Sequence, residues 1–128
     1  MEKAQSLAAP LGRVLISLIF IVSGIGKIAN YGGTQGYMVA MGVPGMLLPA
    51  VIALELIGGI AIILGWKARV AAFLLAGFSL VSAVLFHADF SDQMQTIMFM
   101  KNLALAGGFL FIVAHGAGAW SVDNGGGR

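Results

Sequence analysis

The sequence of 128 residues contains no cysteine and few charged side chains. The lack of cysteine excludes disulfides, a thiol redox centre and any iron–sulfur or zinc site that is ligated by cysteine. Only 9% of the residues are charged, whereas a soluble domain carries roughly a quarter. The lysines and arginines form no basic run that could follow a phosphate backbone, so we expect no nucleic-acid partner.

Apolar sequence dominates instead. Hydrophobic residues make up 59% of the chain and glycine contributes 19 residues, whereas there are only 3 prolines. A water-soluble domain of this length could not bury so much apolar surface. Abundant glycine with little proline is typical of closely packed transmembrane helices. The composition therefore predicts an integral membrane protein whose first partner is the lipid bilayer.

Apolar runs long enough to cross a hydrocarbon core of roughly 30 Å occur four times. The predicted spans are residues 11–29, 47–65, 69–86 and 97–115. We therefore expect an all-α fold, a four-transmembrane-helix bundle, as a single domain over residues 11–123. Residues 1–10 would form the N-terminal segment, and residues 124–128, which are rich in glycine, would form a flexible tail.

The first connection between spans carries signals of a short helix of its own. Thr34 is a predicted N-cap and Gly42 a predicted C′ residue. Residues 35–41 would then form an interfacial helix at the membrane surface. In the same way, Ser91 and Asp92 predict a cap that starts the fourth helix before it enters lipid.

The lysine and arginine bias predicts the orientation, because cytoplasmic loops carry an excess of these residues. With four spans, both termini and the second loop share one side of the membrane. The cationic residues of that side are Lys3, Arg13, Lys67, Arg69 and Arg128, and those of the other side are Lys27 and Lys101. We therefore expect both termini in the cytoplasm, with the loops at 31–46 and 87–96 facing the periplasm.

A weak internal repeat relates the two halves of the chain. Gly58 and Gly59 of the second span, with their apolar neighbours, recur as Gly107 and Gly108 of the fourth. This pattern favours a 2+2 parallel helix-hairpin repeat around an axis along the membrane normal. Chance similarity between two apolar helices is the alternative. We also expect the face with Gly58 and Gly59 to pack against protein, since paired glycines let a neighbouring helix approach closely.

Ionisable side chains are costly inside a span, so each needs a partner or a purpose. Glu55 is predicted to lie roughly 12 Å deep in the second span. Lys101 enters the fourth span from the same side, and Lys27 ends the first span there. An extended lysine can cover the roughly 6 Å of depth between Glu55 and Lys101. We predict a cluster of Glu55, Lys101 and Lys27, with Asn102 and His87 close by, in the outer half of the bundle.

The charges of this cluster sum to +1, which would favour an anion or an electron-rich carbonyl as the ligand. Structural alternatives stay open for its members. Lys27 and Lys101 could snorkel to the interface, and His87 could be an ordinary interfacial residue. Glu55 could belong to an ion pair that only fixes helix register. Arg13, roughly 15 Å from Glu55 along the membrane normal, is a poor direct partner for it.

No catalytic motif accompanies the cluster. His87 and His115 fall at opposite ends of the membrane, so they cannot hold one haem between them. No HExxH, Walker or GxGxxG context exists, because the glycine pairs lie in the middle of helices. We therefore predict no metal and no intrinsic cofactor, and we assign no catalytic residue.

Several short motifs follow one another between Leu11 and Asp123. They are Gly12-Arg13, Ser23-Gly24-x-Gly26-Lys27, Tyr37-Met38, Met41-Gly42-Val43-Pro44, Leu54-Glu55-x-x-Gly58-Gly59, Leu85-Phe86-His87, Phe99-Met100-Lys101-Asn102 and Gly116-x-Gly118-x-Trp120-Ser121-x-Asp123. In this order and spacing, the sequence resembles the DoxX family of small bacterial inner-membrane proteins.

The resemblance implies an auxiliary subunit of a quinone-linked oxidoreductase, with quinone as a ligand and a redox enzyme as a partner. The family's recurrent polar positions correspond to Arg13, Lys27, Glu55, His87, Lys101 and Asn102. We expect secondary or structural roles for Arg13, Ser23 and the glycine pairs Gly58–Gly59 and Gly107–Gly108. Two other hypotheses stay open. One is a transporter of protons or a small solute, which would need to form a homo-oligomer, and the other is a membrane scaffold or assembly factor without catalysis.

Overall fold

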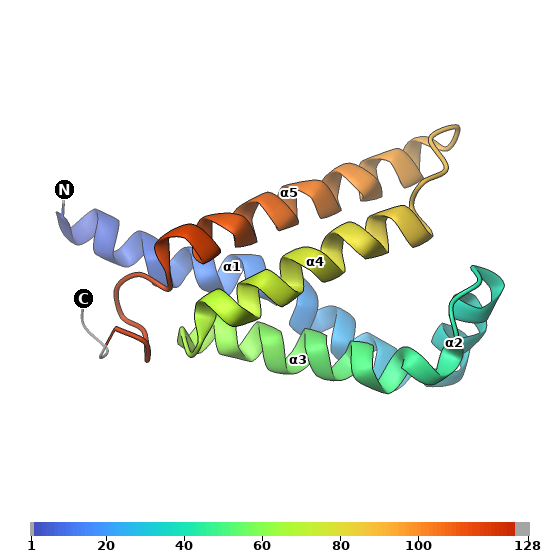
Figure 1. The fold of residues 1–128 in the computed structure, drawn as a ribbon, viewed down its shortest axis with the longest axis horizontal. Helices are drawn as coiled ribbons and strands as arrows, with labels where there is room; N and C mark the ends of the chain where they lie inside the picture. Colours follow the sequence, from blue (N-terminus) through green and yellow to red (C-terminus); the bar gives the residue numbers. More distant parts are fainter. Residues whose placement is uncertain (1, 125–128) are drawn as a thin grey trace.

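The computed structural model describes residues 2–124, and this part of the chain is all-helical (Figure 1). Its elements are α1 (Glu2–Ala29), α2 (Tyr31–Ala40), the short 3-10 helix η1 (Gly45–Leu47), α3 (Leu48–Leu64), α4 (Ala68–Phe86) and α5 (Gln93–His115). The segments long and apolar enough to cross a membrane are Ser6–Ala29, Gly45–Leu64, Ala68–Phe86 and Gln93–His115. The all-α fold with four spans is therefore confirmed.

Two helices begin earlier than their apolar runs. α1 starts at Glu2 and contains Pro10 within it, so the helix extends beyond the segment that hydropathy alone selects. α5 starts at Gln93 because the side chain of Asp92 accepts a hydrogen bond from Met94 N at 2.9 Å. This interaction satisfies one of the free N–H groups of the first turn and confirms the predicted cap.

The short helix of the first connection is present, with a different start. α2 begins at Tyr31, and Asn30 occupies the N-cap position. The prediction that Thr34 is the N-cap is wrong, because Thr34 lies inside the first turn and its hydroxyl donates to the Asn30 carbonyl at 2.8 Å. The predicted C′ residue is confirmed, since Gly42 follows the helix with a φ of +82°.

The four long helices form two hairpins. α1 packs beside α3, α4 packs beside α5, and the contact between α3 and α4 joins the pairs. Figure 1 shows the described chain ends and the α3–α4 turn at one end of the molecule, where the hairpins lie close together. At the other end, α2 and the α4–α5 loop lie apart. Two hairpins are what the weak sequence repeat favours, although their ancestry as a repeat stays a prediction.

An apolar core fills the end where the hairpins converge. Its fully buried members include Ile62 of α3, Leu75 of α4 and Phe109 of α5, and the ring of Phe20 lies 5.5 Å from that of Phe109. Apart from Leu75, the face of α4 towards this core consists of small residues, which let its neighbours approach closely. They are Ala68, Ala72, Ala76, Ser79 and Ala83, all at most 3% exposed.

The outer surface of the bundle carries large apolar side chains. Val22, Phe73 and Phe111 are between 65% and 70% exposed, and many other aliphatic residues of the four spans are exposed with them. In water such an exposed apolar surface would promote aggregation, whereas lipid chains in the hydrocarbon core of a bilayer solvate it favourably.

The glycine pairs lie at helix contacts, with one exception. A Cβ on Gly59 would stand 2.7 Å from Ile21 Cδ1 of α1, and one on Gly58 would stand 3.3 Å from the side chain of Leu75. Gly108 of α5 faces Ile16 of α1 at 2.7 Å. By contrast, Gly107 has nothing within 4 Å of its Cβ position, so only one glycine of the second pair faces a neighbouring helix.

Arg13 holds the convergent end together. Its guanidinium donates to Ile63 O at 3.0 Å and to the carbonyls of Ala119 and Trp120, both at 2.8 Å. The side chain is only 3% exposed. Arg13 therefore joins α1 to the end of α3 and to the segment after α5, far from Glu55.

Asp123 reinforces this connection from the C-terminal segment. Its carboxylate accepts hydrogen bonds from Lys67 N at 2.7 Å and Ala68 N at 2.8 Å, at the start of α4. Its own N–H donates to Gly65 O at 2.9 Å. We call Arg13, Gly65 and residues 119–123 the C-terminal clasp. Of the predicted flexible tail, Asn124 donates to Gly118 O at 2.6 Å, and residues 125–128 lie outside the described part of the chain.

Candidate functional site

A cavity of about 420 Å³ lies between the two hairpins, in the half of the bundle that contains α2. We call it the α2 cavity. Its volume falls in the range of small-molecule sites, roughly 300–1,000 Å³. Most of its wall is aliphatic or aromatic. The polar side chains in the wall are Ser23, Lys27, Thr34, Tyr37, Glu55, Ser79, Ser82, His87, Lys101 and Asn102.

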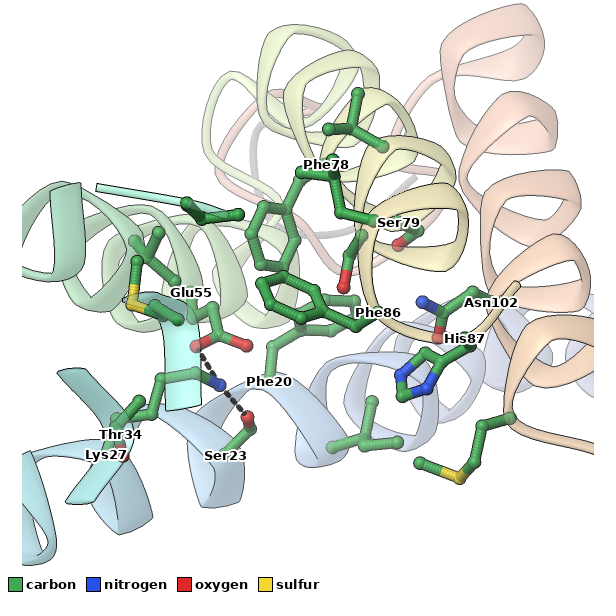
Figure 2. A pocket seen from close by; sticks show the side chains of 18 of the residues that line it. Phe20, Ser23, Lys27, Thr34, Glu55, Phe78, Ser79, Phe86, His87 and Asn102 are labelled. Atoms are coloured by element: carbon green, nitrogen blue, oxygen red, sulfur yellow. Dashed lines mark hydrogen bonds and ion pairs between the residues drawn. The ribbon is translucent and has the colours of Figure 1, made fainter. Parts of the chain in front are cut away.

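The structure brings together all five residues of the predicted cluster. Lys27, Glu55, His87, Lys101 and Asn102 line the same cavity although they come from four different helices or helix ends. Figure 2 shows Lys27 and Glu55 on one side of the pocket and Asn102 and His87 on the other. The five residues thus share one cavity, but the depth argument joined Glu55 to Lys101, whereas the ion pair that forms is with Lys27.

Lys27 and Glu55 form an ion pair. Lys27 Nζ lies 2.9 Å from Glu55 Oε1 and donates a hydrogen bond to Ser23 Oγ at 2.6 Å (Figure 2). Glu55 is 2% exposed, so pairing offsets part of the cost of burying its charge. The pairing is electrostatic in character, because no donor in residues 2–124 makes a well-aligned hydrogen bond to Oε1. Ser23, expected only as a secondary residue, thus orients the lysine.

The absence of a side chain on Gly24 lets α1 and α3 approach closely at this pair. A Cβ at Gly24 would stand 2.7 Å from Leu56 Cδ2 and 3.6 Å from Glu55 Cβ. Since Gly24 lies close along the helix to both Ser23 and Lys27, this close approach places the lysine within reach of the carboxylate.

Two polar residues on α5 and one on α4 have no hydrogen-bond partner in the described part of the chain. Lys101 interacts electrostatically with Lys27 and Glu55, but it makes neither an ion pair within 4.0 Å nor a hydrogen bond. Asn102 is 6% exposed and its amide is also unpaired. The hydroxyl of Ser79 is buried without a partner. Buried polar groups are normally satisfied, so the unpaired Asn102 and Ser79, with the half-buried Lys101 beside them, leave hydrogen-bond donors unused in this part of the wall.

His87 is tied to the rim of the cavity. It ends α4, and its Nδ1 lies 2.7 Å from Gln95 Oε1 of α5. This contact links the two helices where the α4–α5 loop begins. His87 therefore lines the cavity from a position already held by a side-chain partner.

α2 closes one side of the cavity. The ring of Tyr37 stacks on Phe86 of α4 at a centroid distance of 5.4 Å and an interplanar angle of 25°. Tyr37, Thr34 and Met38 of α2 all line the cavity. The short helix thus connects the two hairpins at the end where they diverge.

Comparison with known proteins identifies the family. The sequence model of the DoxX family matches residues 8–88, more than half of the chain, and this range contains Lys27, Glu55 and His87. The chain belongs to the DoxX family. No solved structure matches it.

Two of three relatives of this DoxX protein are inner membrane proteins by name. It is 48% identical over 123 residues to the inner membrane protein YqjF of Escherichia coli strain K12, covering 96% of this chain and 95% of that protein. It is 36% identical over 120 residues to the inner membrane protein YphA of the same strain, covering 88% and 86%. It is 31% identical over 85 residues to the putative oxidoreductase CatD of Bacillus subtilis strain 168, covering 66% and 63%. With its four apolar spans, this DoxX protein is a multi-pass inner-membrane protein.

Sequence reasoning missed the aromatic part of the site in this DoxX protein. Phe20, Phe78 and Phe86 line the cavity, and the ring of Phe20 lies 6.4 Å from that of Phe78. In an apolar span, periodicity alone does not tell a phenylalanine that lines a cavity from one that faces lipid or fills the core. Ser79 had a signal, because it lies in the stripe of small residues on α4. Within residues 2–124, no three histidine, aspartate or glutamate side chains are grouped closely enough to hold a metal ion.

Proposed function

We propose that this protein binds a quinone in the α2 cavity and serves as an auxiliary subunit of a quinone-linked oxidoreductase of the inner membrane. One observation carries the proposal. An apolar, aromatic cavity inside a membrane bundle is lined by unpaired hydrogen-bond donors on Lys101, Asn102 and Ser79.

A quinone fits this wall in shape and in polarity. Its ring is flat and apolar, which suits the aromatic side chains of Phe20, Phe78 and Phe86. Its carbonyl oxygens accept hydrogen bonds, which the unpaired donors can supply. A quinone also reaches such a site through the bilayer, since the cavity lies between helices that cross the membrane.

Reduction of a quinone to a quinol consumes two electrons and two protons. We assign the electrons to a redox partner and the exchange of protons to Glu55, whose carboxylate is held in the wall by Lys27. The word oxidoreductase in the name of the relative CatD supports a redox setting for this family.

The binding step is tested with the purified protein in nanodiscs and a short-chain ubiquinone or menaquinone analogue, by calorimetric titration. We expect Lys101→Met to weaken binding about tenfold or more, because a charged donor in a low-dielectric wall is lost. Lys67→Met is the matched control, since Lys67 is exposed at the α3–α4 turn, away from the cavity. No binding, or equal affinity in both variants, would contradict the proposal.

Glu55→Gln separates this proposal from a purely structural role for the ion pair. A scaffold predicts a lower melting temperature with unchanged quinone affinity. A quinone site predicts a changed affinity or a changed turnover in the presence of the partner. Affinity purification from native membranes, with mass-spectrometric identification of the bound proteins, tests whether that partner is a redox enzyme.

A further inference from the structure

The charges in the α2 cavity do not balance. Lys27 and Glu55 neutralise each other at 2.9 Å. Lys101 lines the same cavity without an ion pair inside 4.0 Å anywhere in residues 2–124. Ionisable residues within membrane spans are almost always paired, because an uncompensated charge is costly there. A negatively charged group on the ligand would provide the missing partner.

The neutral polar groups of the wall point to the same class of ligand. Asn102 and Ser79 are 6% and 2% exposed, and neither has a hydrogen-bond partner in the part of the chain that is described. Both can donate, as can Lys101, so this part of the wall is rich in donors. The carboxylate of Glu55 would repel an anion, but Lys27 compensates it and Figure 2 places that pair across the pocket from Asn102.

The rest of the wall excludes a hydrated inorganic ion. Most of the lining side chains are aliphatic or aromatic, including Phe20, Phe78 and Phe86. An inorganic anion would lose its hydration shell against these side chains and gain few contacts. An aromatic ring that carries one ionised oxygen satisfies the apolar and the cationic parts of the wall together.

We propose that the α2 cavity selects a ring with an anionic oxygen, of the hydroxyquinone class, over the neutral quinone of the same size. Lys101 pairs with the ionised oxygen, and Asn102 and Ser79 donate to a neighbouring carbonyl. This inference rests on the proposed function, because it concerns the ligand of the same cavity.

The test compares 1,4-naphthoquinone with 2-hydroxy-1,4-naphthoquinone, whose hydroxyl is ionised at neutral pH. Both are titrated into the full-length protein in nanodiscs. We expect the hydroxylated probe to bind the unmodified protein about tenfold more tightly, because it completes the ion pair. In Lys101→Met the preference falls to about one, and in Lys101→Arg it persists. The matched control Lys67→Met keeps the full preference.

The outcomes separate this inference from the proposed function. Equal affinity of the two probes for the unmodified protein overturns the inference and leaves the quinone site standing. A preference that survives in Lys101→Met also overturns it, since another cation would then be responsible. If neither probe binds a protein whose circular dichroism and melting are normal, both the inference and the quinone site are wrong.

Discussion

Three of the cationic side chains inside the spans meet three different environments. Arg13 is 3% exposed and donates only to main-chain carbonyls. Lys27 is paired with Glu55 and held by Ser23. Lys101 is the cation of the α2 cavity that has no such partner among the described residues. Position within the bundle, rather than residue type, thus separates a structural cation from one available to a ligand.

The first prediction concerns Arg13. Arg13→Met removes the N–H groups that donate to three partly buried main-chain carbonyls, which would then have no hydrogen-bond partner. We therefore expect the free energy of unfolding to fall by about 3 kcal/mol or more. Thermal melting of the detergent-solubilised protein measures it. Arg69→Met, an exposed arginine at the same end, should melt within a few degrees of the unmodified protein. Equal melting of the two variants would show that the clasp contributes little.

Sequence alone could place Lys27 and Lys101 on the same side of the bundle as Glu55, but it did not decide that Lys27 is the one that pairs with it, and it could not predict the partners of Arg13. The depth of Glu55 and the side from which Lys27 enters the bundle follow from counting residues along helices. The acceptors of Arg13 are main-chain carbonyls, which every residue possesses. Their location depends on how residues 119–123 fold back on the α3–α4 turn, and no local pattern reports this.

At the scale of elements, α2 forms one wall of the cavity. Its Tyr37 stacks on Phe86, and the helix runs without a cap hydrogen bond from the side chain at its N-cap position. Met38 anchors α2 to the first hairpin, because it is 5% exposed and packs in one apolar cluster with Leu48 and Ile52 of α3. Across the opening, Phe86 of α4 packs against this cluster and stacks on Tyr37, so the aromatic pair is one of the contacts that dock α2 on the second hairpin.

The second prediction follows from that contact. Tyr37→Ala should weaken quinone-analogue binding about three- to tenfold, because an aromatic pair is worth roughly 0.5–1.5 kcal/mol. Global stability should change little, since Tyr37 is 47% exposed. Tyr31→Ala is the matched control, because Tyr31 also belongs to α2 but does not line the cavity. Titration calorimetry and melting curves on both variants decide the matter, and a fall in affinity shared by both would contradict the prediction.

The α3–α4 turn is the second element on which the arrangement depends. Gly65 ends α3 with a φ of +69°, a left-handed conformation that favours glycine. A Cβ there would collide with the side chain of Ser121 and would stand 2.5 Å from Arg13 Nη1. The turn and the clasp therefore occupy the same space, and only glycine leaves room for both.

The third prediction tests this packing. Gly65→Ala should cost more than about 2 kcal/mol in the free energy of unfolding, because strain in the left-handed conformation adds to the collision. Gly107→Ala serves as the control, since its Cβ would meet open space and alanine favours the helix. Melting should be lowered in the first variant and unchanged or raised in the second. The reverse order would refute this account of the turn.

Element boundaries show where local signals suffice. The apolar runs located all four spans, and the cap at Asp92 and the glycine at position 42 were visible in the sequence. The N-cap prediction for Thr34 was wrong because a threonine hydroxyl can also sit inside a helix and donate to the carbonyl four residues earlier, as Thr34 does to Asn30. The early start of α1 was hidden because hydropathy reports the apolar part of a helix and not its full length.

At the scale of the whole molecule, both described chain ends lie with the α3–α4 turn at the convergent end of the bundle (Figure 1). This agrees with an even number of spans. Which face of the membrane this end occupies stays a prediction from the lysine and arginine bias, which places it in the cytoplasm.

The fourth prediction uses the lack of native cysteine. Single cysteines are introduced at Ala4 and Ser91, which are exposed at opposite ends of the bundle. In intact cells with a permeable outer membrane, a membrane-impermeant maleimide should label Ser91→Cys and leave Ala4→Cys unlabelled until the inner membrane is opened. Labelling of Ala4→Cys but not of Ser91→Cys in intact cells would show that the predicted orientation is wrong.

The two hairpins diverge at one end of the bundle and converge at the other, so the interior is filled on one side of the α2 cavity only. Below the α2 cavity, Leu75 and Phe109 fill the interior and the C-terminal clasp seals the bundle. Protons that reach a bound quinone would therefore come from the face of the membrane on which α2 lies. Reduction of a quinone at this site would therefore remove protons from that face alone, and oxidation of a quinol would release them there.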